Sequence, residues 1–231
     1  MFNRLNRAIQ QALDPGATRA APARQPTLET LLPGDVVSLW DGGDCVVQAV
    51  LECREELNGR ETRWRWNLLD DGRLLEVALE GNVLYERTVV FHQDSAEFET
   101  LTSDPEQGGV LKAFEARVRE GTAARHPTLF EYDGRTYRVI STGIFEARPA
   151  GVPSYSPTAY PQAEVWRDIN PSNPSDNVYF EMEPTEPTPG DPNTEVLGVW
   201  TSHIALLFGR PLKGADIQSI YPRAEPEAPS R

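Results

Sequence analysis

The sequence of 231 residues predicts a mainly β protein made of two similar antiparallel β-meander units, packed as a sandwich or as partly open barrels. Three observations lead to this prediction. Apolar residues alternate with polar ones in several short runs, turn-forming dipeptides separate those runs, and the pattern returns in the second half of the chain. We expect one helix to join the two units and an amphipathic helix to precede them.

The amphipathic helix is predicted over residues 1–13, "MFNRLNRAIQQAL". At helical spacing its apolar side chains gather on one side, and its arginines and amides gather on the other. Asp14-Pro15 ends the helix, because proline disfavours helical geometry in the residue before it. Residues 14–29 then form a flexible linker. Contacts with a partner or a membrane are expected from six residues of this arm: Phe2, Arg4, Leu5, Arg7, Ile9 and Leu13.

Three roles fit the arm: docking in a groove of a partner or of the same chain, lying on an anionic membrane surface, or capping the β body. A helix of this length is marginal by itself in water. Two arginines add only about 1 kcal/mol each near an anionic surface. Packing on protein is therefore favoured over membrane binding.

The first β unit is expected over residues 30–102, where "CVVQAVLEC", "RWRWNL" and "LLEVALE" alternate with a period of two. Such alternation is typical of antiparallel strands with one buried and one solvated face. Asp41-Gly42, Asp71-Gly72 and Gly81-Asn82 suit tight turns, so we expect a meander of about five strands. In the first run, these residues are predicted to share one face: Cys45, Val47, Ala49, Leu51 and Cys53.

A connecting helix is expected over residues 103–123, and it is predicted to end at Gly121. Its apolar residues recur at helical spacing and are predicted to face the body: Val110, Leu111, Phe114 and Val118.

The second β unit is expected over residues 124–222. Its start, "FEYDGRTYRVISTGIFEAR", aligns with "SLWDGGDCVVQAVLECREE" when Asp133-Gly134 is set on Asp41-Gly42, which places Val139 on Val47. The match favours an internal duplication, although two unrelated hairpins with an Asp-Gly turn would also look alike.

Two proline-rich stretches of the second unit are predicted to be loops. Residues 148–177 and 183–195 are rich in proline, which lacks the donor that a strand ladder needs, so both are predicted to be long irregular loops. The tail, residues 223–231, is predicted to be disordered.

Charge separates the arm from the body. Residues 1–25 hold four arginines and one aspartate, a balance of +3, whereas the rest of the chain holds 18 basic and 34 acidic residues, a balance of -16. Nucleic acids and anionic membranes attract positive surfaces. We therefore expect the body to repel both, and we expect no nucleic-acid partner.

Cys45 and Cys53 fall in one predicted strand, where eight residues span roughly 26 Å. A disulfide needs Cα atoms within about 7 Å, so free, buried thiols in a reducing compartment are expected. The sequence has no apolar run of about 18 residues and no secretory signal at its start. These features predict a cytoplasmic protein, with peripheral contact at the inner membrane face as an open alternative.

No catalytic, metal or cofactor site is predicted. His92, His126 and His203 lack the spacing of metal ligands, and the cysteines lack C-x-x-C spacing. The sequence has none of the glycine-rich or nucleophile motifs of phosphate cradles and serine hydrolases. We therefore expect a non-enzymatic protein without a cofactor.

An acidic stretch of the second unit supplies the alternative site. Its carboxylates could gather a polyamine or another cation, although a solvated acidic loop is the simpler interpretation. For Trp64 and Trp66, packing in the core is favoured over a ligand cage. The candidate cation ligands are Glu181, Glu183, Glu186, Asp191 and Glu195.

Residues 30–222 resemble the bacterial domain-of-unknown-function family 4178 (DUF4178). The resemblance rests on packing and turn residues, and also on "YDGRTYRV", "YFEMEP" and "VLGVW" in the second half. Leu74 departs from the pattern, in which a tryptophan is expected at this position. The matching residues of the first half are Gly34-Asp35, Val47, Trp64, Leu68, Leu75 and Val77.

The resemblance implies a cellular context for the protein but no chemical reaction. Members of that family are found in gene neighbourhoods with phage-shock-protein-A-like proteins, small membrane proteins and polyamine-linked ATP-grasp ligases, and no catalytic residues are assigned to them. The chain is therefore expected to be a non-enzymatic scaffold or adaptor in a bacterial membrane-stress system. Its expected partner is a phage-shock-A-like or small membrane protein. The alternative is a polyamine- or cation-binding module, or an enzyme that uses the acidic loop.

Overall fold

The fold is taken from a computed structural model that describes residues 24–40, 43–79, 84–94, 109–132, 134–151, 177–186, 195–200 and 203–223. Within these residues the protein is mainly β, as the sequence predicts, with a single α-helix. The predicted helix at residues 1–13, most of the linker and the tail from residue 224 lie outside the described residues, as do most of the two proline-rich stretches.

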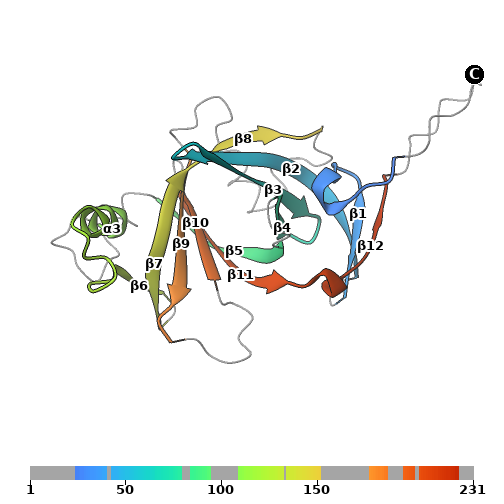
Figure 1. Cartoon of the computed structure of the whole chain (residues 1–231). Coiled ribbons are helices and arrows are strands. Elements are labelled where there is room, and N and C mark those ends of the chain that lie inside the picture. Colours follow the sequence, from blue (N-terminus) through green and yellow to red (C-terminus); the bar gives the residue numbers. More distant parts are fainter. Residues whose placement is uncertain are drawn as a thin grey trace, which may run out of the picture.

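Strands make up most of the described chain, and Figure 1 shows their arrangement. In chain order the elements are η1 (Leu28–Thr30), β1 (Val36–Leu39), β2 (Gly43–Leu57), β3 (Arg60–Leu69), β4 (Arg73–Ala78), β5 (Leu84–Asp94), α3 (Val110–Arg119), β6 (Leu129–Tyr132), β7 (Arg135–Ile144), β8 (Glu146–Pro149), β9 (Val178–Pro184), β10 (Glu195–Trp200), β11 (His203–Leu212), η4 (Gly214–Asp216) and β12 (Ile217–Tyr221).

All described strand pairs are antiparallel, and the strands follow the path β12-β1-β2-β3-β4-β5-β11-β10-β9-β7-β6, with β8 beside β2. The predicted five-strand meander is present as β1 to β5. The start of β2 forms a small sheet with β1 and β12, and the rest of β2 belongs to the large sheet. In Figure 1, α3 and β6 lie at one end of the molecule, and β1 and β12 lie at the other.

Two hairpin turns show the expected chemistry. Asp71-Gly72 lies between β3 and β4, and Gly72 has a φ of 87°. Asn58-Gly59 joins β2 to β3 with φ angles of 53° and 74°, the left-handed pair that an Asn-Gly turn favours. This second turn is the strongest short-range hairpin signal in the sequence, yet it was not among the turns predicted. The predicted turns at Asp41-Gly42 and Gly81-Asn82 lie outside the described residues.

Strand β2 changes the face that it buries halfway along its length. Val47 pairs with Leu69, whereas Ala49 pairs with Leu68, so Gln48 is an extra residue that forms a bulge. A single extra residue turns the following side chains to the other face, because side chains alternate along a strand. The prediction that every second residue from Cys45 to Cys53 shares one face was therefore wrong beyond Val47.

Strand β7 has the same feature. Val139 pairs with Met182 and Ser141 with Glu181, so Ile140 is the extra residue. In the alignment of the two units, Ile140 falls on Gln48.

Three clusters of buried apolar residues result from these bulges. The terminal core lies between β1, the first half of β2, β3 and β4: Leu31, Val37, Leu39, Cys45, Val47, Val50, Leu69, Leu75, Val77 and Leu212. The helix core lies under α3: Val110, Leu111, Phe114, Phe130, Tyr137, Val139, Phe180, Met182, Val196, Leu206 and Phe208. The central core lies between the two predicted units: Leu51, Cys53, Trp66, Leu74, Phe145, Ala147, Leu197, Val199, Ala205 and Leu207.

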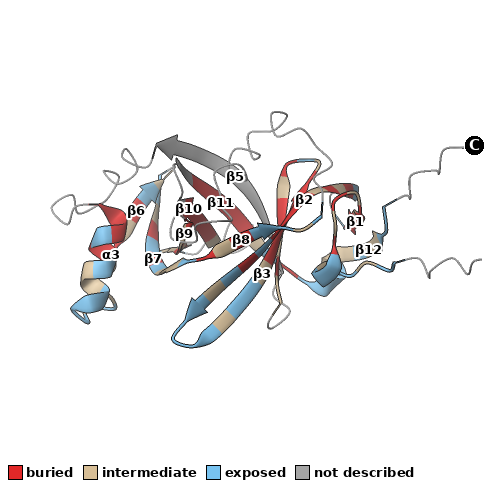
Figure 2. Ribbon diagram, turned by 90° about the horizontal axis from the view of Figure 1, so that it is seen from above, coloured by how far each residue is buried: buried red, intermediate tan, exposed pale blue. Residues whose placement is uncertain are grey.

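The central core takes residues from both predicted β units, so the two units share one interior. β12 also pairs with β1, and β8 pairs with β2. The connecting segment of residues 103–123 therefore joins two units that share one core, a point that the sequence alone leaves open. In Figure 2 the buried residues follow the middle of the strands, whereas the tip of the β2–β3 hairpin is exposed.

The connecting helix is shorter than predicted, and one of its assigned contacts was wrong. Val110, Leu111 and Phe114 are buried, but Val118 is 54% exposed because it lies in the last turn, beyond the edge of the sheet. Gly121 follows with a φ of 68° and ends the helix as expected. Cys45 and Cys53 are free and buried, which confirms that prediction.

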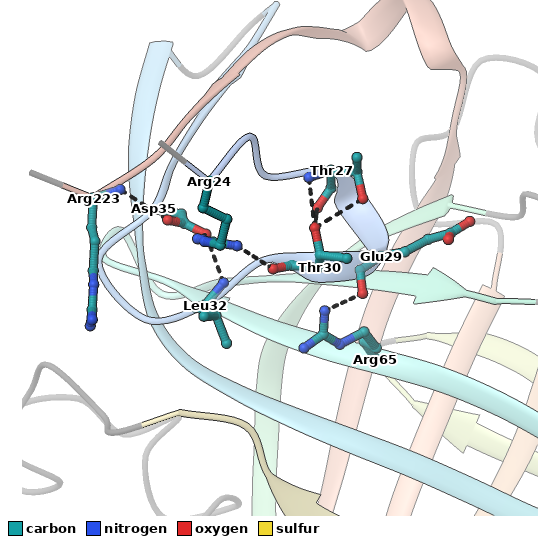
Figure 3. Close-up of polar contacts among 8 residues, drawn as sticks. All are labelled: Arg24, Thr27, Glu29, Thr30, Leu32, Asp35, Arg65 and Arg223. Atoms are coloured by element: carbon teal, nitrogen blue, oxygen red, sulfur yellow. Dashed lines mark hydrogen bonds and ion pairs between the residues drawn. The ribbon is translucent and has the colours of Figure 1, made fainter. Parts of the chain in front are cut away.

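A buried carboxylate holds the two ends of the described chain together (Figure 3). Asp35 is fully buried and accepts hydrogen bonds from the backbone N–H of Leu32 at 2.8 Å and of Arg223 at 3.0 Å. The guanidinium of Arg24 forms an ion pair with the same carboxylate and donates to the carbonyl of Thr30. Gly34, with a φ of 94°, lets the chain pass close to Arg223.

We expect Asp35→Ala to lower the free energy of unfolding by about 3 kcal/mol, because two part-buried backbone N–H groups and the cation of Arg24 lose their buried acceptor. Urea denaturation measures this loss as a lower midpoint at an unchanged slope. Glu115→Ala, which removes an exposed carboxylate from α3, is the control. If Asp35→Ala matched the control, strand pairing alone would hold the ends.

Candidate functional site

A cavity of about 230 Å³ lies between the two predicted units and is the candidate site. One wall is formed by β2 to β5, and the other by β9 and β10. Three carboxylates and four aromatic rings line it, and no Lys, Arg or His is among its described lining residues. The residues are Glu55, Thr62, Trp64, Trp66, Glu76, Ala78, Tyr85, Tyr179, Glu181 and Leu197.

Strand register places the lining residues of the first wall in rows. Thr62, Trp64 and Trp66 alternate along β3 and therefore share one face. Glu55 pairs with Thr62 at one end of this stripe, and Glu76 pairs with Trp66 at the other end. The backbone positions of Glu55 and Glu76 are thus separated by four residues of β3, or about 13 Å along that strand.

The opposite wall presents a phenol and the third carboxylate. Tyr179 and Glu181 alternate along β9, and Leu197 of β10 pairs with Glu181. The hydroxyl of Tyr179 donates to Glu55 at 2.8 Å, which joins the two walls at the Glu55 end. Glu181 lies two residues farther along β9, about 7 Å away.

Each carboxylate is held by a neighbour. The indole N–H of Trp66 donates to Glu76 at 2.9 Å, and the hydroxyl of Ser141 donates to Glu181 at 2.5 Å. Together with the Tyr179–Glu55 bond, these contacts fix all three carboxylates on the cavity wall. The hydroxyl donors of Glu55 and Glu181 are neutral, so they orient these two carboxylates without cancelling their negative charge.

Aromatic rings form a continuous surface in the cavity. The ring of Trp64 lies 6.1 Å from that of Trp66, 6.1 Å from that of Tyr179 and 5.5 Å from that of Phe145, all within the range of favourable contacts. Trp66 is buried, as the preference for core packing predicted, but Trp64 is only half-buried. The faces of such rings attract cations.

Gly143 makes room for one end of the cavity. A Cβ at this position would lie 2.1 Å from Oε1 of Glu55 and 2.6 Å from the ring of Tyr179. Any larger residue would displace the side chains that join the two walls. Gly143 is the second-last residue of β7, and glycine within a strand often marks such a close approach.

The electrostatics of the cavity oppose further negative charge. Burial raises the pKa of the Tyr179 phenol, and its hydrogen bond to Glu55 and the nearby charges of Glu55 and Glu181 raise it further. The phenol therefore remains a neutral donor at physiological pH.

A second cavity of about 260 Å³ lies on the other side of Trp64. Its lining includes Arg54, Arg63 and Arg148, but each guanidinium already contacts a carboxylate of Glu61 or Glu146. Each arginine of this cavity is therefore paired with a carboxylate, whereas the first cavity has no basic side chain in its described lining.

Of the five acidic residues predicted as cation ligands, Glu181 lines the cavity. Glu183 instead forms an ion pair with Arg138, and Glu186 is exposed beyond the end of β9. Glu195 is half-buried at the start of β10, and Asp191 lies outside the described residues. The arm residues Phe2, Arg4, Leu5, Arg7, Ile9 and Leu13 also lie outside them.

Sequence reasoning missed Glu55, Glu76, Tyr85 and Tyr179. Glu76 alternates with Leu75 and Val77, so the pattern assigns it to a solvated face. The opposite wall that covers this face comes from a segment about a hundred residues away. The pattern within β4 therefore does not indicate that Glu76 is covered.

The described residues hold no group of three His, Cys, Asp or Glu side chains placed to bind a metal ion. In the same part of the chain, no helix has the length and apolar character that crossing a membrane requires. His126 lies on the loop after α3, and the side chains of His92 and His203 are not among those described.

Comparison with known proteins found no match: no protein-family model, no curated protein and no solved structure is significantly similar to the chain. The resemblance to family 4178 therefore stays a prediction.

We predict that the Tyr179 phenol ionises only well above pH 10, the ordinary pKa of tyrosine. Because its pKa is raised in the folded state, its contribution to stability is complete below pH 10 and is lost as the pH rises above that value. The measurement is a pH titration of tyrosinate absorbance in the unchanged protein and in Tyr179→Phe. The difference between the two curves gives the pKa of Tyr179. Glu55→Gln should lower it, whereas Glu56→Gln, an exposed neighbour, should not. If Tyr179 ionised near pH 10 in the unchanged protein and in both Glu variants, the buried hydrogen bond to Glu55 would be contradicted.

Proposed function

We propose that the protein is a non-enzymatic binding module that takes a small organic cation, of the polyamine class, in the cavity between its two β units. The observation that carries this proposal is the lining of three carboxylates and four aromatic rings without a described basic side chain. Carboxylates supply charge complementarity, and aromatic faces supply both cation–π attraction and an apolar surface for methylene groups.

The charge of the whole body supports the same ligand class. With a balance of -16 outside residues 1–25, the body creates a negative field that draws cations toward it and repels anions. The effect acts on the rate of association and weakens with salt.

Binding is favoured over catalysis by the state of the cavity groups. A proton-transfer group works best when its pKa lies near the working pH. The pKa of Tyr179 is moved away from neutrality, and its hydroxyl is engaged by Glu55. The arrangement therefore suits a static, preformed binding wall.

Spermidine should bind in calorimetry at low ionic strength, with affinity that falls as salt rises. Glu181→Gln should weaken binding at least tenfold, because it removes a cavity carboxylate but keeps an acceptor for Ser141. Glu183→Gln is the matched control, since Glu183 lies on the same strand and pairs with Arg138 outside the cavity. Flat titrations with spermidine, tetramethylammonium and Mg²⁺ would refute the proposal.

The internal duplication belongs to the same proposal. In each unit the strand after the first hairpin carries its bulge at the aligned residue, Gln48 or Ile140. In each unit residues before the bulge enter an outer core: Cys45 and Val47 in the first, Tyr137 and Val139 in the second. Farther along, Leu51 and Cys53 of β2, and Phe145 directly after β7, belong to the central core. This shared behaviour supports an ancestral unit repeated twice, with the cavity at the junction of its copies.

An adaptor role in a membrane-stress system is the second candidate, with the protein at the cytoplasmic face of the inner membrane. The contact that favours it is the clamp at Asp35, which fixes Arg24 beside Arg223. The chain that carries the predicted helical arm, residues 1–13, is thereby held at Arg24. Under this candidate the arm docks on a phage-shock-A-like protein, and the cavity regulates or stabilises the body.

A chain that starts at Arg24 tests the adaptor role, because it loses the arm but keeps the clamp. The full chain should co-sediment with a purified phage-shock-A-like protein, and the shortened chain should not. Anionic liposomes in place of the protein separate membrane binding from protein docking. Equal co-sedimentation of both chains would assign the contact to the β body, and no co-sedimentation would remove this candidate.

A further inference from the structure

The cavity lies within reach of the point where the described chain begins. Arg24 is held by the carboxylate of Asp35 (Figure 3), and the carbonyl of Asp35 accepts a hydrogen bond from the N–H of Val47 at 2.8 Å. Glu55 follows Val47 by eight residues along β2, a span of about 26 Å. Residues 1–23, which lie outside the described residues, therefore join the body about 26 Å from a carboxylate of the cavity.

The predicted linker is long enough to cross this span. Its ten residues before Arg24, residues 14–23, reach about 33 Å when extended. As a flexible coil the same ten residues have an end-to-end distance of roughly 17 Å, so the required length lies between the two values. A group on such a tether meets the cavity at an effective concentration on the order of millimolar. A contact that is weak between separate molecules is thereby populated within one chain.

Two carboxylates of the cavity have the capacity to bind a cation. Glu55 accepts a hydrogen bond from the hydroxyl of Tyr179, and Glu181 accepts one from the hydroxyl of Ser141. Each carboxylate has about four acceptor sites, so one neutral donor leaves room for a charged one. Thr62, which pairs with Glu55, is exposed, so this end of the cavity opens to solvent.

The predicted arm, residues 1–13, carries the matching chemistry. Arg4 and Arg7 are its only charged side chains. A guanidinium is planar, donates to a carboxylate in a fork and stacks on an aromatic ring, here that of the half-buried Trp64. The balance of +3 in residues 1–25 against -16 in the rest of the chain draws the two parts together.

We infer that an arginine of the arm, Arg4 or Arg7, occupies the cavity when no free cation is bound. Its guanidinium contacts Glu55 and Glu181 and lies against the ring of Trp64. This inference rests on the proposed function, because it treats the cavity as a cation site, and it adds the regulation of that site. A free cation competes with the arm, so ligand binding releases residues 1–13 for a contact elsewhere.

Disulfide trapping in the full-length chain tests where the arm lies. Asn6→Cys places a thiol beside Arg7 in the sequence, and Thr62→Cys places one on the cavity wall. The two natural cysteines are buried. Under mild oxidation at low salt, we expect a disulfide between the introduced cysteines, identified by peptide mass mapping. Adding Arg4→Gln and Arg7→Gln should slow its formation at least fivefold, because the tether remains but the attraction is lost.

Two further variants of the same cysteine pair separate the cavity from the general charge of the body. Glu55→Gln with Glu181→Gln removes both carboxylates, keeps an acceptor for each hydroxyl donor, and should slow trapping as the arginine changes do. Glu56→Gln with Glu183→Gln removes the same charge outside the cavity and should leave the rate unchanged. Thermal unfolding checks that each variant is folded.

Spermidine links the trapping to the proposed function. It should slow trapping in the chain that keeps Arg4 and Arg7, because it competes for the same carboxylates. In calorimetry, the chain with Arg4→Gln and Arg7→Gln and no introduced cysteine should bind spermidine roughly fivefold more tightly than the unchanged chain, since no arginine then occupies the site.

The outcomes separate this inference from the proposed function. Equal trapping rates with and without the arm arginines would overturn the inference, while spermidine binding in calorimetry would leave the proposed function intact. Spermidine that binds without slowing the trapping would also overturn the inference. Arginine-dependent trapping without any spermidine binding would uphold the arm contact and overturn the polyamine proposal.

Discussion

The structure depends on a β-bulge in each of two strands, at Gln48 of β2 and at Ile140 of β7. Without the bulge at Gln48, Glu55 would share a face with Val47 and would lie on the side of β2 away from the cavity. With the bulge, Leu51 and Cys53 enter the central core, and Glu55 reaches Tyr179. The bulge at Ile140 lies at the aligned position of β7, and Gly143 beyond it lies against Glu55 and Tyr179.

This arrangement explains how an acidic, aromatic cavity can exist inside a well-packed protein. The central core supplies the rings that form its surface, and the edge of the same core supplies the indole and hydroxyl donors that hold the carboxylates. The carboxylates of Glu55 and Glu181 face one space, and like charges repel one another. A cation relieves that repulsion, which is the physical reason to associate this cavity with a positively charged ligand.

The clamp at Asp35 links the cavity half of the molecule to the chain ends. The carboxylate is fully buried and draws its donors from both ends of the described chain. It secures the segment before β1 and Arg223, two residues beyond β12, the strand that pairs with β1. Because β1 also pairs with the start of β2, the clamp steadies the strand whose far end carries Glu55.

The sequence by itself determined the β class, the five-strand meander, the position of α3 and the state of the two cysteines, because period-two alternation, helical spacing and turn residues are local signals. Tertiary structure decided which face each half of β2 buries, since a bulge leaves no mark in an alternating pattern. Tertiary structure also created the cavity, because β9 and β10 cover the face of β4 that carries Glu76. Glu55 contacts Tyr179, which lies 124 residues farther along the chain. Contacts that depend on two distant segments cannot be read from either segment alone.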